Sequence, residues 1–297
     1  MKQYLLIDIG GTFIKYSLAD EQARKISGGK VPTPLTNMDD LLAVIEGFAA
    51  PLQGQFVGCA ISMPGRIDTR NGIAHTGGML SAFMWEQPFA AQVEARLGVP
   101  VTIANDGKCA AAAEGWTGAL AGVENGLVLA LGTGIGGGIV LDGKILHGLS
   151  GIAGEVGHII IHKDGLPCAC GASGCYECYA STTALVREAK KVCPRCENGR
   201  ILFEELNAGN EAIREVIENW VSEIACGLAS LIHTFNPPCV VLGGGIMNEP
   251  YLQERLNVLI RKYAMPSFLK GMVLTRAKLG NKAGIMGAAK LAMDQTV

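Results

Sequence analysis

One histidine and three cysteines stand close together in the chain, at His158, Cys168, Cys170 and Cys175. The glycines between these cysteines permit tight turns, through which three thiolates can converge on one point. A set of three cysteines and one histidine fills a tetrahedral zinc site and leaves no open position, which is typical of structural zinc. Unrelated buried thiols and a core histidine are the alternative, but such residues do not usually cluster among glycines at this spacing. The spacing therefore predicts a structural zinc site.

Two carboxylates, Glu155 and Glu177, flank these four residues. If the four ligands are complete, neither glutamate is needed for the metal. We expect both to face a ligand whose binding site the zinc loop helps to shape.

A short glycine turn near the start of the chain is suited to binding phosphate. Residues 4–9 and 13–18 are strand-like, and Gly10, Gly11 and Thr12 lie at the turn between them. The backbone N–H groups and the Thr12 hydroxyl can bind an anion, which side chains at the glycines would block. Asp8 is placed to hold Mg²⁺ through water, and Lys15 adds a positive charge. A glycine turn in any β protein is the alternative interpretation.

The same pattern recurs in the middle of the chain, which favours the phosphate interpretation. Residues 127–131 and 139–141 are strand-like, with Gly132, Thr133 and Gly134 beginning the turn between them. This recurrence predicts a duplicated domain with one ligand between two glycine tips. Neither turn matches a Walker A loop or a dinucleotide fingerprint. A third turn, Gly243-Gly244-Gly245, follows the buried strand expected at residues 239–242.

Asn105 and Asp106 follow an apolar strand at residues 99–104 and precede an alanine-rich helix. An aspartate there can serve simply as an N-cap. Its place at the carboxyl end of a strand, where α/β folds bind ligands, favours a functional role. Such an aspartate can accept the proton of a hydroxyl that attacks a phosphoryl group.

The elements that position these residues alternate between strands and helices, so the fold is predicted to be α/β. Apolar spacing and stop signals predict helices at the following positions: 38–49, 89–97, 107–117, 211–235 and 283–293. The chain of 297 residues is long for one domain, so two lobes are expected.

Composition excludes several classes of function. The net charge is −2 and no basic run is present, so nucleic acid is not an expected partner. No apolar run reaches a membrane-spanning length, and the first strand begins near Tyr4, so neither a membrane segment nor a signal peptide is expected. Ten cysteines without a secretory signal indicate reduced thiols in a cytoplasmic protein.

Together these motifs resemble the ROK (repressor, open reading frame, kinase) family of sugar kinases, over essentially the whole chain. The resemblance implies two ribonuclease-H-like lobes of the actin and hexokinase superfamily, with a cleft between them for ATP and a hexose. We place residues 1–116 and 283–297 in a small lobe, and residues 117–282 in a large lobe. The implied reaction is ATP- and Mg²⁺-dependent phosphorylation of the 6-hydroxyl by a homodimer, with zinc in a structural role.

The resemblance also implies a role for each motif. Asp106 is expected to be the catalytic base. The sugar hydroxyls are expected to contact Gly65, Arg66, Asn105, Asp106, Glu155, His158 and Glu177. The nucleotide and its Mg²⁺ are expected near Asp8, Gly10, Gly11, Thr12, Lys15, Gly132, Thr133, Gly134, Gly243, Gly244 and Gly245. Zinc is expected on His158, Cys168, Cys170 and Cys175, so His158 would serve both metal and sugar.

Two departures from the family pattern stand out. Gly77-Gly78 replaces side chains near the expected C1–C2 edge of the sugar, which predicts room for a β-glucoside or a 2-N-acyl hexose such as N-acetylmannosamine. Cys178, Cys193 and Cys196 are additional thiols, interpreted as ordinary residues of a variable segment rather than a metal or redox pair.

The alternatives are a non-catalytic sugar sensor of the same fold and a superfamily ATPase doing mechanical work. The intact Asp8 turn and Asp106 argue against the sensor, and the sugar-type carboxylates argue against the ATPase. A ROK repressor would carry an N-terminal helix-turn-helix domain, for which the sequence before the first strand leaves no room.

Overall fold

The computed structural model describes residues 2–295. Within this range the chain folds as two compact units. The first unit contains the residues up to Gly122, the segment Gly138–Gly154 and the residues from Asn281 onward. The second contains Val123–Gly137 and Glu155–Gly280.

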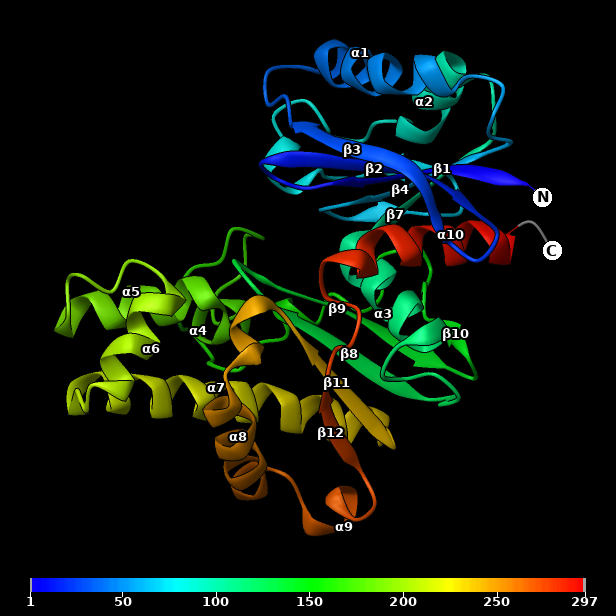
Figure 1. The fold of residues 1–297 in the computed structure, drawn as a ribbon. Helices are drawn as coiled ribbons and strands as arrows, with labels where there is room; N and C mark the ends of the chain where they lie inside the picture. The colour runs from blue at the N-terminus through cyan, green and yellow to red at the C-terminus, as the bar shows by residue number, and fades with distance from the viewer. Residues whose placement is uncertain (1, 296–297) are drawn as a thin grey trace. The chain divides into compact units, whose positions relative to one another are not determined.

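A five-stranded sheet forms the centre of the first unit (Figure 1). β1 pairs antiparallel with β2 and parallel with β4, and β7 continues the sheet parallel to β4. In sheet order the strands are β3 (Lys25–Pro32), β2 (Phe13–Asp20), β1 (Gln3–Ile9), β4 (Cys59–Met63) and β7 (Val101–Asn105). A separate ribbon joins β5 (Ile67–Asp68) to β6 (Ile73–Ala74), and the turn η2 (Gly78–Leu80) follows.

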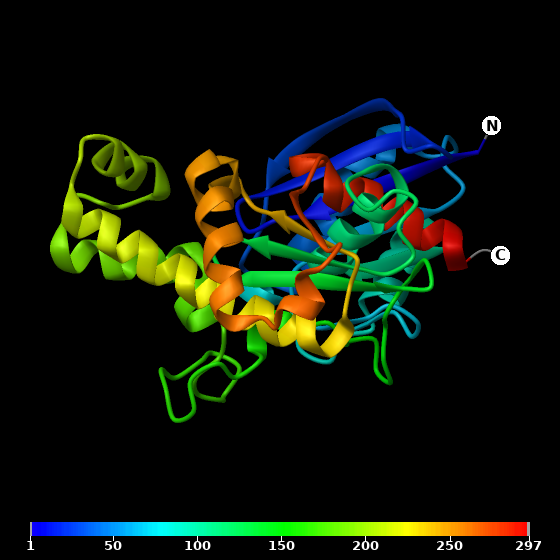
Figure 2. The same cartoon turned by 90° about the horizontal axis from the view of Figure 1, so that it is seen from below.

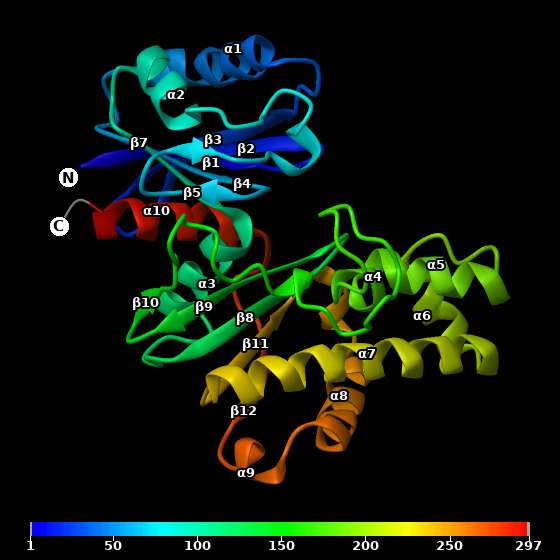
Figure 3. The same cartoon turned by 180° about the vertical axis from the view of Figure 1, so that it is seen from behind.

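Helices cover both faces of this sheet, as Figures 1 and 3 show. α1 (Met38–Ala49) and α2 (Phe89–Leu97) lie on one face, and α3 (Asp106–Thr117) and α10 (Ala283–Gln295) lie on the other. Strand alternation explains the two cores. Leu5, Ile7 and Ile9 pack with the leucines and phenylalanines of α1 and α2, whereas Leu6 packs with the small residues of α3 and α10.

The second sheet repeats the topology of the first. Its order is β10 (Lys144–Ile145), β9 (Ile135–Leu141), β8 (Gly126–Leu131), β11 (Cys239–Gly243) and β12 (Val273–Arg276). As in the first sheet, β11 pairs parallel with β8 and with the outer strand β12. Asp142-Gly143 turns β9 into the antiparallel β10, with both residues at positive φ. The duplication predicted from the two glycine turns is therefore present in the fold.

The long helix α7 (Glu211–Phe235) organises the remaining helices of the second unit. It packs against α4 (Glu177–Ala180), α5 (Thr182–Val192), α6 (Gly199–Asn207) and α8 (Pro250–Tyr263), and Figure 2 shows α8 crossing it. Asn210 caps its start and Asn236, at φ 43°, ends it before two prolines. The short elements are η1 (Ala50–Leu52), η3 (Val156–His158), η4 (Gly245–Asn248), α9 (Pro266–Leu269) and η5 (Gly280–Lys282).

The α/β class and the pair of related sheets predicted from the sequence are confirmed. The two compact units have different limits from the predicted lobes, because Gly138–Gly154 and the residues up to Gly122 belong to the first unit. The reason is local packing: a Cβ on Gly138 would lie 2.4 Å from Cβ of Ala111, so the end of β9 lies directly against α3. Among residues 2–295, no helix is both long and apolar enough to cross a membrane.

Candidate active site

The first glycine turn joins β1 to β2 and is held by backbone and side-chain hydrogen bonds. Gly10 N–H donates to the Phe13 carbonyl at 3.0 Å, and the Thr33 hydroxyl donates to the Gly10 carbonyl at 2.7 Å. A Cβ on Gly11 would lie 2.2 Å from the Met79 methyl group. Gly11, Thr12 and Gly10 thus form a compact tip whose backbone can approach an anion.

Asp8 and Lys15 face each other across the two strands that enter this turn. They are register partners in the β1–β2 ladder, and Lys15 Nζ lies 3.3 Å from Asp8 Oδ2. On the other side of Asp8, a Cβ on Gly284 of α10 would lie 2.5 Å from Asp8 Oδ1. The absence of a side chain at Gly284 therefore lets α10 approach this carboxylate. The sequence analysis did not single out Gly284; its only signal was the small-residue composition of the last helix.

Asn105, rather than Asp106, caps α3. Asn105 Oδ1 accepts from Lys108 N–H at 3.2 Å, and Asn105 Nδ2 donates to the Gly65 carbonyl at 2.8 Å. The cap interpretation considered for Asp106 is therefore wrong. Asp106 is the first residue of the helix and is exposed, with Oδ1 accepting from Gly107 N–H at 2.8 Å. A carboxylate there is favoured by the helix dipole.

Gly65 and Arg66 lie at the loop that Asn105 holds. Gly65 has φ 104°, and a Cβ there would lie 2.1 Å from the Thr76 carbonyl oxygen, so only glycine fits this backbone. Arg66 N–H donates to the Thr76 hydroxyl at 3.1 Å, and its side chain is exposed. Within the first unit, the hydrogen bond from Asn105 thus brings Gly65 close to Asn105 and to the start of α3, where Asp106 lies.

The predicted open space at Gly77-Gly78 is not found. A Cβ on Gly77 would lie 2.6 Å from Cβ of Met84, and a Cβ on Gly78 would lie 3.1 Å from Cβ of Pro64. Gly78 also has φ 58°, which side chains rarely adopt. Tight packing and turn geometry therefore explain this glycine pair, and the prediction that it makes room for a substituent on the sugar is wrong.

The second glycine turn, in the second unit, contacts Glu177 directly. Ile135 N–H donates to Glu177 Oε2 at 2.8 Å, and a Cβ on Gly134 would lie 2.1 Å from the same oxygen. Thr182 N–H donates to the Gly132 carbonyl at 2.8 Å, and the Thr183 hydroxyl donates to the Thr133 carbonyl at 2.7 Å. Hydrogen bonds from the start of α5 and to the Glu177 carboxylate therefore hold the turn in place. The sequence did not predict the contact between the turn and Glu177.

A pocket of about 580 Å³ opens beside this turn. Gly132, Thr133 and Gly245 contribute to it, together with residues of α5, α6 and their connection. Gly244 has φ 104°, and a Cβ added to it would lie 1.9 Å from the Leu131 carbonyl oxygen, so the third glycine turn packs closely against the end of β8. Gly243 is the buried last residue of β11. Sequence reasoning missed these lining residues: Thr182, Thr183, Val186, Glu197, Asn198, Gly199, Arg200, Phe203 and Glu249. The Asn198-Gly199 pair, typical of a helix start, was the one sequence feature that could have predicted part of this lining.

A larger hollow of about 860 Å³ in the first unit contains none of the predicted site residues. It lies against β2, β3 and α1, and the stacked rings of Tyr16 and Phe48 belong to its lining. Its lining is mainly apolar, with side-chain hydroxyls only on Tyr16, Ser27 and Thr33, and it has none of the charged groups that favour phosphate.

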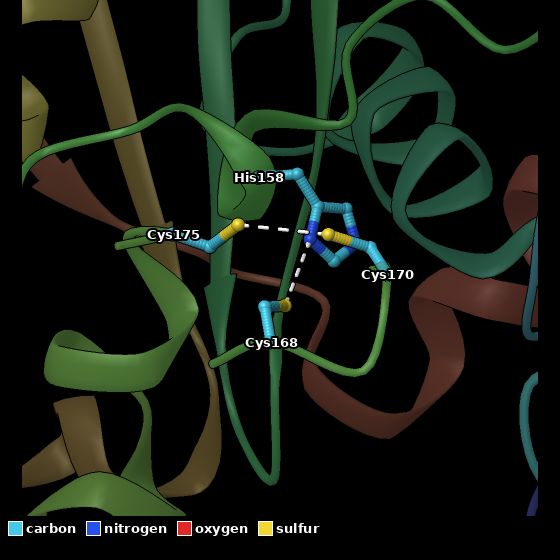
Figure 4. A group of neighbouring side chains, drawn as sticks. All are labelled: His158, Cys168, Cys170 and Cys175. Atoms are coloured by element: carbon cyan, nitrogen blue, oxygen red, sulfur yellow. Dashed lines mark hydrogen bonds between the residues drawn. The ribbon is translucent and has the colours of Figure 1, made fainter. Parts of the chain in front are cut away.

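The four predicted zinc ligands converge in the second unit, as Figure 4 shows. Their ligand atoms all lie within 4.8 Å of one another, with Cys168 Sγ 3.7 Å from His158 Nδ1 and Cys170 Sγ 3.6 Å from Cys175 Sγ. A zinc tetrahedron with Zn–S bonds of about 2.3 Å has edges of about 3.8 Å. The donor atoms therefore fit a tetrahedral zinc ion.

Tight turns build this cluster. Cys168 N–H donates to the Ala172 carbonyl at 2.8 Å, and Gly171 and Gly174 have φ of 93° and 82°. The Ala172 backbone N–H lowers the pKa of Cys170, whereas burial raises the pKa of Cys175 to about 12. A metal cation would supply the charge that keeps such a buried thiolate ionised.

The same cluster positions the two predicted sugar-binding glutamates. Glu177 begins α4, directly after the buried Tyr176, and Tyr176 N–H donates to the Ile159 carbonyl at 2.8 Å. Glu155 precedes η3, and its carbonyl accepts from His158 N–H at 3.0 Å. Both glutamates and His158 are partly exposed.

Comparison with known proteins identifies the family. The ROK family profile matches residues 4–295. The chain is 33% identical to a glucokinase of Streptomyces coelicolor, over 97% of this chain and 96% of the relative. It is 30% identical to an N-acetyl-D-glucosamine kinase of Haemophilus influenzae, over 97% and 98%.

A solved structure gives the same answer for the fold. A ROK family glucokinase from Streptomyces griseus, solved with glucose and AMPPNP, superposes with a TM-score of 0.84. The two chains are 30% identical, over 98% of this chain and 99% of the other. The protein therefore belongs to the ROK family.

Proposed function

We propose that this protein is a ROK-family sugar kinase that transfers the γ-phosphoryl group of ATP to the primary 6-hydroxyl of a hexose or hexose derivative. The observation that carries the proposal is the position of Asp106. Its carboxylate is exposed at the start of α3, and the helix is capped by Asn105 and not by Asp106. Family membership and the resemblance to glucokinases and an N-acetylglucosamine kinase support the substrate class.

In the proposed reaction, Asp106 accepts the proton of the sugar hydroxyl as its oxygen attacks the γ-phosphorus. The new O–P bond forms while the bond to the β,γ-bridging oxygen breaks, and ADP leaves. General-base catalysis of this kind contributes about 10²–10⁴-fold to the rate. The partial positive charge at a helix start favours the carboxylate form of a side chain there, which is the form that acts as a base.

We propose that Glu155, His158 and Glu177 bind the sugar hydroxyls, with Asn105, Gly65 and Arg66 completing the set. An ionised carboxylate accepts hydrogen bonds from hydroxyls, and a neutral imidazole can accept one through one nitrogen and donate one through the other. His158 can serve both metal and sugar, because its Nδ1 faces Cys168 and leaves Nε2 for a hydroxyl. Asn105 has one amide hydrogen and one lone pair beyond its two hydrogen bonds.

For the nucleotide, we propose that the pocket beside Gly132 and Gly245 holds the adenosine. Gly10, Gly11, Thr12, Thr133 and Gly134 would contact the phosphates, with Gly243 and Gly244 shaping the adenosine end. Mg²⁺, an oxygen-seeking cation, would be held through Asp8 and would neutralise phosphate charge. The Lys15 ammonium beside Asp8 adds to this charge.

We propose that zinc is structural, on His158, Cys168, Cys170 and Cys175, because the four donors fill a tetrahedron and leave no position for water. A cytoplasmic location and a homodimer also remain proposals from the sequence. Sedimentation analysis of the purified protein would test the dimer.

An ADP-release assay with and without sugars tests the proposed function. The panel contains glucose, N-acetylglucosamine, N-acetylmannosamine, allose, mannose, fructose and cellobiose. We expect ADP release that depends on at least one sugar and a product phosphorylated at O6. Sugar binding without turnover would instead indicate a sensor, and sugar-independent turnover would indicate a different ATPase.

A further inference from the structure

Lys108 is a buried lysine two residues after the proposed base. Its exposed fraction is 1%, although lysine is almost never fully buried in proteins unless it is paired. Residues two apart on a helix do not share a face, and accordingly Asp106 is exposed while Lys108 points inward. The proposed reaction gives Lys108 no chemical role, so its burial needs another explanation.

The Lys108 ammonium donates a hydrogen bond to the carbonyl of Gly151. Gly151 belongs to a strap, defined here as residues 147–154, that follows β10 within the first unit. The strap is closed on itself by Ala153 N–H, which donates to the His147 carbonyl at 3.1 Å. Figure 3 shows that β10, the strand that precedes the strap, lies beside α3.

The strap is also packed against the β5–β6 ribbon. Gly151 has φ 75°, and a Cβ on it would lie 2.7 Å from Cα of Asp68 and 3.0 Å from the Ile67 carbonyl oxygen. The Asp68 carboxylate in turn fixes its own turn by accepting from the N–H groups of Arg70 and Asn71. Lys108 therefore joins three segments at one point: the start of α3, the strap and the ribbon that follows Gly65.

The position of this junction along the chain is informative. The strap ends at Gly154, and the next residue is Glu155, a proposed sugar ligand. At the other end of the junction, α3 starts with Asp106, the proposed base. Three residues, Ile152, Ala153 and Gly154, separate Gly151 from Glu155, so the strap held at Gly151 is the backbone that leads directly into Glu155.

We propose that Lys108 is a positioning residue for sugar binding, which holds the strap at Gly151 and thereby sets the position of Glu155. This inference rests on the proposed function, since it assumes that Glu155 binds the sugar. It predicts that loss of the ammonium weakens sugar binding and leaves nucleotide binding unchanged. Hydrogen bonds from charged donors are among the strong ones, so the effect should be about tenfold to a hundredfold.

The test compares Lys108→Met, which keeps the length and apolar volume of the side chain, with wild type. Lys144→Met is the matched control, because Lys144 is an exposed lysine in β10 of the same connecting segment. The readouts are KM for the best sugar, KM for ATP, kcat, and sugar affinity by calorimetry without nucleotide. We expect the sugar KM and Kd to rise about tenfold to a hundredfold in Lys108→Met, with ATP KM within twofold, and no change in Lys144→Met.

A second variant keeps the proposal testable if Lys108→Met does not fold. Gly151→Ala leaves the lysine in place but displaces the strap from Asp68, and it should raise the sugar KM without changing that for ATP. A sugar KM within twofold of wild type in the folded variants would overturn the proposal, as would equal rises in both KM values. Absence of sugar-dependent turnover in the wild type would instead refute the proposed function, and calorimetry would still report sugar affinity.

Discussion

Replacing Asn105 by alanine should reduce both stability and turnover, because this side chain makes two hydrogen bonds with different purposes. Loss of the helix N-cap costs about 1 kcal/mol. Loss of the bond from Asn105 Nδ2 to the Gly65 carbonyl, at 2.8 Å, costs about another 1 kcal/mol. At about 2–4 °C per kcal/mol for a unit of this size, the total of about 2 kcal/mol lowers the melting temperature by about 4–8 °C.

Turnover should fall for a separate reason. Without its cap, the first turn of α3 frays, and Asp106 is its first residue. Displacement of a reacting group by about 1 Å can cost about 10²-fold in rate, so kcat should fall about tenfold to a hundredfold. Calorimetric melting and steady-state ADP release measure the two effects on the same samples.

Asn37→Ala is the matched control. Asn37 caps α1 in the same unit and accepts from Asp40 N–H at 2.8 Å, but it holds no predicted site residue. It should lose about 1 kcal/mol of stability with kcat unchanged. If Asn105→Ala kept wild-type kcat while losing stability, the idea that Asn105 positions Asp106 would be refuted.

Two further predictions concern metal and nucleotide. Purified protein should contain one zinc per chain by elemental analysis. Cys170→Ser should lose the zinc and most of the activity, whereas Cys178→Ser, at a neighbouring cysteine, should keep both. Active protein without zinc would contradict the structural-zinc proposal. Gly245→Val should raise the KM for ATP about tenfold or more, because the valine side chain would fill the pocket beside Gly132, and the sugar KM should be unchanged. Equal KM values for ATP in the variant and the wild type would show that this pocket is not part of the nucleotide site.

Much of the fold was predictable because local signals and tertiary structure agree. The helices at 38–49, 89–97 and 211–235 coincide with α1, α2 and α7, since their apolar spacing, their start and their stop signals all point the same way. The glycine hairpins were predictable for the same reason. The convergence of Cys168, Cys170 and Cys175 was predictable because they are close in the sequence and the glycines between them permit tight turns.

Other features depend on contacts that a sequence does not display. The sequence analysis assigned no element to β3, which contains Gly28-Gly29; glycine is depleted in strands, yet pairing with β2 makes this segment a strand. The sequence predicted open space at Gly78. Pro64, which packs against Gly78, is distant from it in the sequence, so only the folded structure shows the contact. The limits of the two units could not be predicted either, because β9 continues into the first unit through packing against α3.

The most direct test of the central claim is the turnover of Asp106→Asn with the best sugar and ATP. The amide keeps the shape of the carboxylate but cannot act as a base, so kcat should fall about 10²–10⁴-fold while calorimetric sugar affinity stays within a few-fold of wild type. Asp39→Asn, at an exposed position in the first turn of α1, should retain wild-type kcat. An Asp106→Asn variant that keeps more than about a tenth of the wild-type kcat would show that Asp106 is not the general base.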